Sequence, residues 1–189
     1  MSILQTSQLS SSGEIIIPTN NSLYGVDLGS ISAPGLNVQT VYARVDTKST
    51  YSLPINTNTE ITDLTLTITP KSATSVILLQ YMVTFEVHYN TIFRLSRNGV
   101  VIGTNTTDAN RWSGWANPGH DQDVSSTPNT NYYMYWDLPA TTSPVTYRFL
   151  CSPTDGTAQT FYLNRAAGGA GSDAIEVGIS YVILQEVAQ

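Results

Sequence analysis

The fold is decided by residues 60–104, which read EITDLTLTITPKSATSVILLQYMVTFEVHYNTIFRLSRNGVVIGT. Polar and apolar residues alternate over 64–69, and Pro70 then ends the pattern because proline cannot donate to a strand ladder. Residues 76–87 are apolar at nearly every position at first and alternate afterwards. This pattern is typical of a central strand that is covered on both faces at its start and on one face further along.

A hairpin signal closes this stretch. Asn98-Gly99 lies between the apolar runs 92–95 and 100–102. A type I′ turn needs positive φ at both central residues, which asparagine and glycine tolerate, so the pair predicts a two-residue hairpin. The stretch as a whole therefore predicts consecutive strands that act as a scaffold.

The remainder of residues 36–189 continues in the same style. Short segments with strand character alternate with turns rich in Gly, Pro and Asn, and no window shows the period of an amphipathic helix. The irregular stretch 105–130 is long enough to suggest a function or a partner contact. We expect an all-β fold, an antiparallel β-sandwich of jelly-roll type. The further segments expected as strands are 38–45, 51–53, 132–137, 145–151, 160–164 and 174–187.

Residues 1–35 differ in character from the rest. They are mostly polar and linker-like but contain isolated apolar groups, so we expect a short extended N-terminal arm that lies on a neighbouring subunit and adds a strand to an open edge. An ordinary tail or a first strand of the same domain is the alternative. The apolar candidates for capsid docking are Ile3, Leu4, Ile15, Ile16, Ile17, Leu23 and Tyr24.

The composition restricts the partners. Charged residues make up only 12% of the 189 residues, and the formal net charge is −6. An acidic chain does not attract phosphate backbones, so we expect no nucleic-acid binding. No stretch reaches the roughly 20 apolar residues of a membrane span. The first residues lack the pattern of a signal peptide, which predicts synthesis inside a cell and export by another route.

Residues with reactive chemistry are few. The single cysteine, Cys151, shares the parity of Tyr147 and Phe149 and is expected to be a buried thiol rather than a nucleophile. His88 at a strand end is expected to be structural. The cluster 120–123, His-Asp-Gln-Asp, offers two carboxylates to a calcium ion but lacks the glycine and glutamate of an EF-hand loop. We therefore expect no enzyme activity, no cofactor and no bound metal.

Aromatic residues provide the remaining candidates for contact. Trp112 and Trp115 lie in the irregular stretch, where they would stack on a sugar, pack the loop onto the sandwich or meet a neighbouring subunit. In the segment 132–136, aromatic residues occur on both faces of one predicted strand. We take Trp112, Trp115, Tyr133 and Tyr135 as candidates for receptor or subunit contact.

Five motifs follow one another along the chain: Thr62–Ser75, Phe93–Gly99, Asp137–Thr142, Phe161–Arg165 and Ile179–Glu186. They resemble segments of virion proteins of tailed phages, cyanophages among them. The motifs occur in the same order in that family, and the resemblance covers residues 36–189. Members of the family are usually labelled tail-fibre or structural proteins.

The resemblance implies a β-sandwich, often trimeric, on the exterior of a virion, and it supplies no catalytic residues. We accordingly expect a homotrimeric capsid decoration or cement protein, assembled in the bacterial host cytoplasm, with the major capsid protein as partner. The alternative is a tail-fibre tip or adaptor that contacts other tail proteins and binds a glycan or protein on the host surface.

Overall fold

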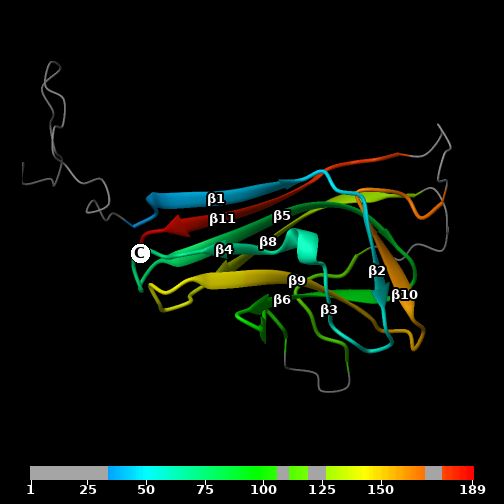
Figure 1. The fold of residues 1–189 in the computed structure, drawn as a ribbon. Coiled ribbons are helices and arrows are strands. Elements are labelled where there is room, and N and C mark those ends of the chain that lie inside the picture. The colour runs from blue at the N-terminus through cyan, green and yellow to red at the C-terminus, as the bar shows by residue number, and fades with distance from the viewer. Residues whose placement is uncertain (1–33, 106–110, 119–126, 169–175) are drawn as a thin grey trace, which may run out of the picture. The chain divides into compact units, whose positions relative to one another are not determined.

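A computed structural model describes residues 34–105, 111–118, 127–168 and 176–189 (Figure 1). These residues form strands and one 3-10 turn at Thr62–Leu64, with no α-helix among them. The strands are β1 (Asn37–Val45), β2 (Ser49–Leu53), β3 (Thr59–Glu60), β4 (Leu66–Ile68), β5 (Val76–Val87), β6 (Thr91–Arg97), β7 (Val100–Ile102), β8 (Asn129–Asp137), β9 (Val145–Pro153), β10 (Gln159–Leu163) and β11 (Ser180–Val187).

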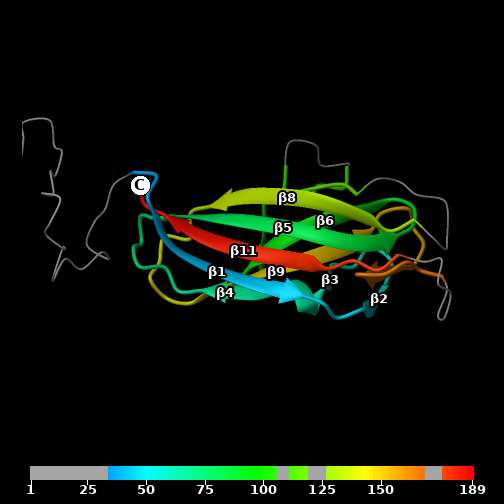
Figure 2. The ribbon, with the colours of Figure 1, turned by 90° about the horizontal axis from the view of Figure 1, so that it is seen from above.

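The long strand β5 is the centre of the first sheet, here called the β5 sheet. One edge of β5 pairs with β8 over nine residues. Its other edge pairs with β11 along residues 76–82 and with β10 along residues 85–87. Strand β1 lies beyond β11, and β2 lies beyond β10. All pairs are antiparallel, and Figure 2 shows β1, β11, β5 and β8 side by side.

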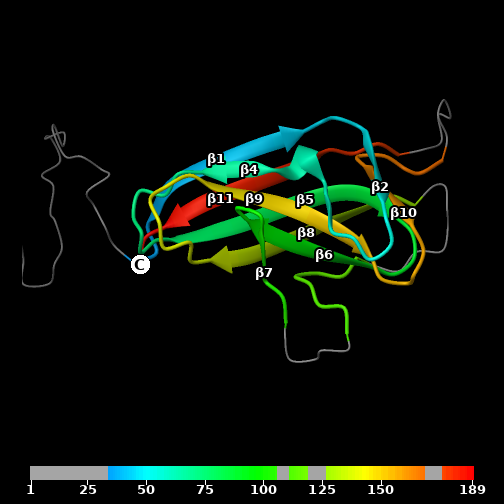
Figure 3. The same ribbon diagram turned by 60° about the horizontal axis from the view of Figure 1, so that its bottom comes forward.

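The second sheet, here called the β9 sheet, is built around β9. Strand β6 pairs with one edge of β9 along seven residues, and β7 pairs with β6. The short strands β3 and β4 share the other edge of β9. Figure 3 brings this sheet forward, with β4, β9, β6 and β7 in view. The strands at this edge are short because prolines and turn residues lie around them, and proline cannot donate to a strand ladder.

The hydrophobic core lies between the two sheets. The inward parity of β5 is buried from Ile77 to Val87, and the inward parity of β9 is buried from Val145 to Cys151. Rings from both sheets meet there: the centroids of Phe85 and Phe93 are 5.2 Å apart, and those of Tyr81 and Phe149 are 5.6 Å apart. Two antiparallel sheets that pack face to face form a β-sandwich, which confirms the predicted architecture.

The predicted hairpin is present between β6 and β7. Asn98 and Gly99 have φ values of 50° and 85°, so both central residues have the positive φ that a type I′ turn needs. Arg97 pairs with Val100 directly beside the turn. The Asn98 side chain also accepts a hydrogen bond from the Thr146 N–H at 2.8 Å, which joins the turn to β9.

Two strand starts differ from the prediction by three residues or more. Strand β8 begins at Asn129, three residues before the predicted 132, because its polar start still pairs with Val83–Phe85 of the long strand β5. Strand β11 begins at Ser180 instead of 174. Gly178 lies just before this start, where the backbone approaches β5 closely. A Cβ at this position would lie 2.5 Å from the Thr84 side chain, so this approach requires glycine.

A charged contact joins the ends of the two sheets. Asp137, the last residue of β8, accepts hydrogen bonds from Arg97 Nη1 at 3.0 and 3.1 Å. The Tyr147 hydroxyl of β9 donates to the same carboxylate at 2.7 Å. Asp137 is buried, so these bonds replace the water that an isolated carboxylate would require.

Candidate interaction surface

The outward face of the β5 sheet is lined by large apolar side chains. Across four strands the register places Tyr42 opposite Ile183, Ile183 opposite Gln80, and Gln80 opposite Met134. We call this surface the aromatic face. Its outward residues are Thr40, Tyr42, Leu78, Gln80, Met82, Tyr132, Met134, Trp136, Tyr181, Ile183 and Gln185.

No charged side chain interrupts the aromatic face along these residues. Its centre is crossed by uncharged hydrogen bonds: the Tyr132 hydroxyl donates to Gln80 Oε1, and Gln80 Nε2 donates to Gln185 Oε1 at 2.6 Å. Arg44 stands at one end of the face and is paired with Asp46 at 2.8 Å. Removing this surface from water therefore carries little of the desolvation cost that charged groups impose.

The exposed area of the aromatic face is comparable to that of the largest apolar patch on a typical monomer. The exposed fractions are 72% for Tyr42, 57% for Tyr132, 55% for Met134 and 54% for Trp136. An aromatic side chain presents about 150–250 Å², so these four residues together expose roughly 400 Å² or more of surface. The largest apolar patch on a typical monomer covers about 300–600 Å², and such patches often mark binding sites.

The two candidate tryptophans lie in different environments. Trp115 is packed onto the core: its ring lies 5.5 Å from that of Tyr81 and 5.9 Å from that of Phe149, and its Nε1 donates to the Met134 carbonyl at 3.0 Å. Trp112 is 44% exposed, and the Arg94 guanidinium lies 5.5 Å from its ring centroid. The structure therefore does not bring the two rings together, and Trp112 alone is accessible to a ligand.

The candidate tyrosines Tyr133 and Tyr135 have inward parity. Both are partly buried against the core, and the Tyr133 ring lies 5.6 Å from Phe93. The exposed large apolar residues of the same strand are their neighbours Tyr132, Met134 and Trp136. Sequence reasoning did not single out these outward residues, nor Tyr42. Their alternation in 129–137 was the available signal, but both parities carry aromatic residues.

Several predicted residues lie outside the described ranges. They are the docking candidates Ile3, Leu4, Ile15, Ile16, Ile17, Leu23 and Tyr24, together with the carboxylate cluster 120–123. The predicted arm at 1–35 and its role in docking therefore stay predictions.

The reactive side chains Cys151 and His88 in the described ranges are engaged in the packing and hydrogen bonding of the fold. Cys151 is fully buried, and this burial raises the pKa of its thiol. His88 Nε2 lies 3.1 Å from the buried Glu86 carboxylate, which also accepts from the Ala167 N–H at 2.7 Å. Among the described residues, no three His, Cys, Asp or Glu side chains gather in a metal-binding arrangement. The same residues include no helix with the length and apolar character that crossing a membrane requires.

Comparison with known proteins yields structural neighbours only. No protein-family profile matches the chain, and no curated protein matches its sequence. A chain in the structure of infectious bursal disease virus Gx strain is 12% identical, with a TM-score of 0.34 over 81% of this chain. A mutant VP2 protein from T=1 particles of infectious bursal disease virus is 10% identical, with a TM-score of 0.34 over 89% of this chain.

Both neighbours come from infectious bursal disease virus. The chain spans 38% and 41% of their lengths. At this low similarity we base no functional inference on them. The described residues thus define a β-sandwich with one uncharged aromatic face.

Proposed function

We propose that this chain is a structural protein on the exterior of a phage particle, a trimeric decoration or cement protein that bridges neighbouring shell subunits. The observation that carries the proposal is the aromatic face, because exposed patches of apolar side chains often mark sites of contact with another protein. In the trimer this face packs against another copy of the chain. The predicted arm at 1–35 reaches the major capsid protein. The proposal assigns the chain no catalysed reaction.

The energetic logic is that of assembly-linked stability. A protein that binds only the assembled shell stabilises that shell by mass action, without changing the isolated subunits. The roughly 400 Å² of surface that the four exposed apolar residues of the aromatic face present per copy is about half of the roughly 800 Å² that each partner contributes to a stable interface, so neighbouring residues must supply the rest.

The test compares particles assembled with and without the chain. We expect particles that lack it to open at lower temperature or in lower salt, measured by light scattering and dye access to the packaged genome. Adding back the purified chain should restore stability, whereas a chain that lacks residues 1–35 should not. Equal stability with and without the chain would contradict the proposal.

We further infer a jelly-roll connectivity. The described strands are ordered β1-β11-β5-β8 in one sheet and β4-β9-β6-β7 in the other. In the first sheet the late strand β11 lies between the earlier strands β1 and β5, and in the second sheet β9 lies between β4 and β6. Two interlocked Greek keys give this order. Jelly rolls are common in viral shells, so this order supports a virion role.

A receptor-binding tail-fibre tip or adaptor is the second candidate function. The observation that favours it is Trp112, exposed beside a cavity of about 260 Å³ that Asn117 and Ser113 also line. A glycan array is the test: binding that disappears in Trp112→Ala would support this role. Trp115→Ala is unsuitable for the purpose because Trp115 packs against the core.

A further inference from the structure

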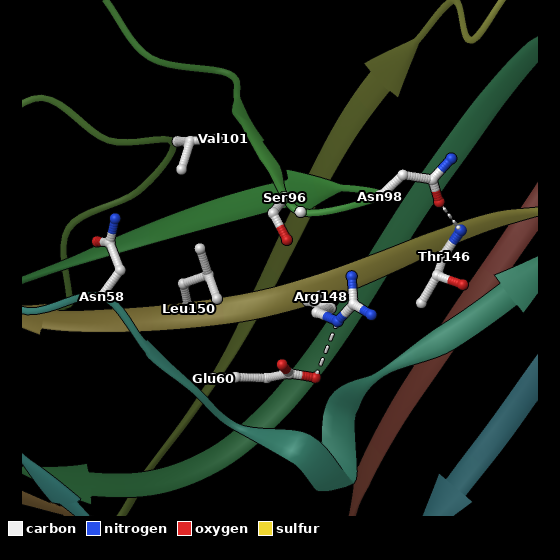
Figure 4. Close-up of a pocket in the computed structure, with 9 residues that line it drawn as sticks. Asn58, Glu60, Ser96, Asn98, Val101, Thr146, Arg148 and Leu150 are labelled. Carbon is white, nitrogen blue, oxygen red and sulfur yellow. Dashed lines mark hydrogen bonds and ion pairs between the residues drawn. The ribbon is translucent and has the colours of Figure 1, made fainter.

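The outward face of the β9 sheet carries a hollow with a volume of about 680 Å³. Strands β3 and β9 and the β6–β7 hairpin surround it (Figure 4). Ligand sites in proteins usually enclose about 300–1,000 Å³, so the hollow is large enough for one or two sugar rings. It lies on the sheet opposite the aromatic face and has a different chemistry.

Arg148 lies at the centre of the hollow with part of its guanidinium uncommitted. Its Nε is 3.2 Å from Glu60 Oε1, and that oxygen also accepts the Thr65 hydroxyl at 2.8 Å. Within the described residues no other polar contact engages Arg148, so its two terminal nitrogens remain as donors. Thr65 and Glu60 thereby orient the guanidinium, and the planar edge of such a group binds a carboxylate through two parallel hydrogen bonds.

Two asparagines add further donors. The Asn58 side-chain oxygen accepts from Arg94 Nη1 at 2.6 Å, and the Asn98 side-chain oxygen accepts from the Thr146 N–H at 2.8 Å. Because both amide oxygens are occupied, each amide has its NH₂ group left for a ligand. The hollow therefore presents mainly hydrogen-bond donors and is suited to a ligand rich in acceptor oxygens.

The charge balance at the hollow favours a ligand with a single negative charge. The charged residues that line it are Arg148 and Glu60, whose formal charges cancel, and Arg94 adds a positive charge behind Asn58. Glu60 repels one carboxylate on Arg148 less than it repels a doubly charged phosphate. Leu150 and Val101 line the same hollow and offer apolar contact to the carbon face of a ring.

We propose that this hollow binds a carboxylate-bearing sugar residue of the uronic acid class. Arg148 holds the carboxylate, and the amides of Asn58 and Asn98 donate to ring and hydroxyl oxygens. An acidic peptide would use the arginine but lacks the hydroxyl groups that the amides recognise. The inference goes beyond the virion role, since it concerns a ligand on the sheet that faces away from the proposed subunit contact.

The experiment is a titration of the full chain with D-glucuronate, followed by NMR chemical shifts and calorimetry. Glucose is the neutral counterpart, and inorganic phosphate and a pentaglutamate peptide are the other probes. We expect glucuronate to bind at least about tenfold more tightly than glucose, because a charge-assisted bidentate contact is lost without the carboxylate. Equal binding of glucose, or tighter binding of phosphate or of the peptide, would overturn the proposal.

Variants locate the site. Arg148→Gln should weaken glucuronate binding at least about tenfold and leave glucose unaffected, whereas Arg44→Gln, on the opposite sheet, should leave both unchanged. If Arg148→Gln fails to fold, Val101→Glu introduces a repelling charge at the exposed rim and should weaken binding in the same direction. Unchanged binding in the folded variant overturns the site. Self-association and particle stability are separate measurements, so failure here is distinguishable from failure of the structural role.

Discussion

The two outward faces of the sandwich offer different chemistry to a partner. The aromatic face of the β5 sheet runs across four strands with Arg44 as the charged side chain at its end, and its polar groups include the amides of Gln80 and Gln185. The hollow of the β9 sheet is built from an ion pair, Glu60 with Arg148, and from amides. The inward sides of the two sheets are similar, because both are packed with aliphatic and aromatic residues.

The difference shows where function is encoded in such a fold. Successive side chains of a strand point to opposite faces, so packing constrains one parity and leaves the other free to vary. A fold therefore sets the platform, while the outward residues decide what it binds. The face without charges suits contact with another protein surface, and the face with donors suits a polar ligand.

The largest effect should separate the core from the outer surface. Trp115→Ala removes a ring that packs on Tyr81 and Phe149, and should lower the free energy of unfolding by about 3–5 kcal/mol. Trp112→Ala removes an exposed ring and should cost less than about 1 kcal/mol. Urea denaturation followed by fluorescence and circular dichroism measures both. Similar costs for the two variants would contradict the packing of Trp115 against the core.

A second contrast concerns one carboxylate from each sheet. Glu186 is buried and accepts from the Lys71 and Ser72 N–H groups and from Gln39. Burial alone would raise the pKa of Glu186, but these hydrogen bonds outweigh it and lower the pKa below its ordinary value of 4.5. The stabilisation is therefore complete above pH 4.5 and is lost as the pH falls through the lowered pKa.

Substitution of the two carboxylates tests this difference. Glu186→Gln should lower the free energy of unfolding at pH 7 by about 2–3 kcal/mol, because the Lys71 and Ser72 N–H groups lose a charged acceptor. It should also flatten the loss of stability below pH 4.5. Glu60→Gln, at a partly exposed ion pair, should cost at most about 1 kcal/mol. Thermal unfolding from pH 3 to 7 compares the variants, and an equally steep acid transition in Glu186→Gln would contradict the assignment.

Matched charges on the two faces test the subunit contact. Trp136→Lys on the aromatic face should weaken self-association about thirtyfold, the loss typical of a buried interface tryptophan. Val100→Lys in the β6–β7 hairpin, at a residue 65% exposed, should leave the mass in solution unchanged. Sedimentation equilibrium measures both. A wild-type chain that is monomeric at high concentration, or a Trp136→Lys variant that still forms trimers, would remove the aromatic face from the proposal.

Local signals explain why the sandwich was predictable from the sequence. The Asn98-Gly99 turn and Pro70 act on their immediate neighbours, so no distant partner is needed to interpret them. The outward face was harder to predict. Residues 132–136 and 180–187 carry apolar or aromatic side chains on both parities, so alternation alone does not tell which side meets the core.

The hollow depends on pairing between segments that lie far apart in the chain. Glu60 reaches Arg148 only because β3 pairs with β9 and places Glu60 opposite Leu150. Neither residue belongs to a motif that signals a site. The jelly-roll connectivity and the trimer stay predictions. The docking arm at 1–35 also stays a prediction, because nearly all of it lies outside the described residues.

The smallest effect should come from Tyr81, at the inward side of the β5 sheet. Its hydroxyl is buried without a hydrogen-bond partner among the described residues, and burial raises the pKa of this phenol. Tyr81→Phe removes the unsatisfied group and keeps the ring, so the free energy of unfolding should rise by up to about 1 kcal/mol. Tyr147→Phe is the matched control on the β9 sheet and should destabilise, because it deletes the hydrogen bond to Asp137. The two changes in the free energy of unfolding, measured by urea denaturation, should have opposite signs, because both rings are buried and only the Tyr147 hydroxyl has an acceptor. A loss of stability in Tyr81→Phe would show that the Tyr81 hydroxyl is hydrogen-bonded in solution.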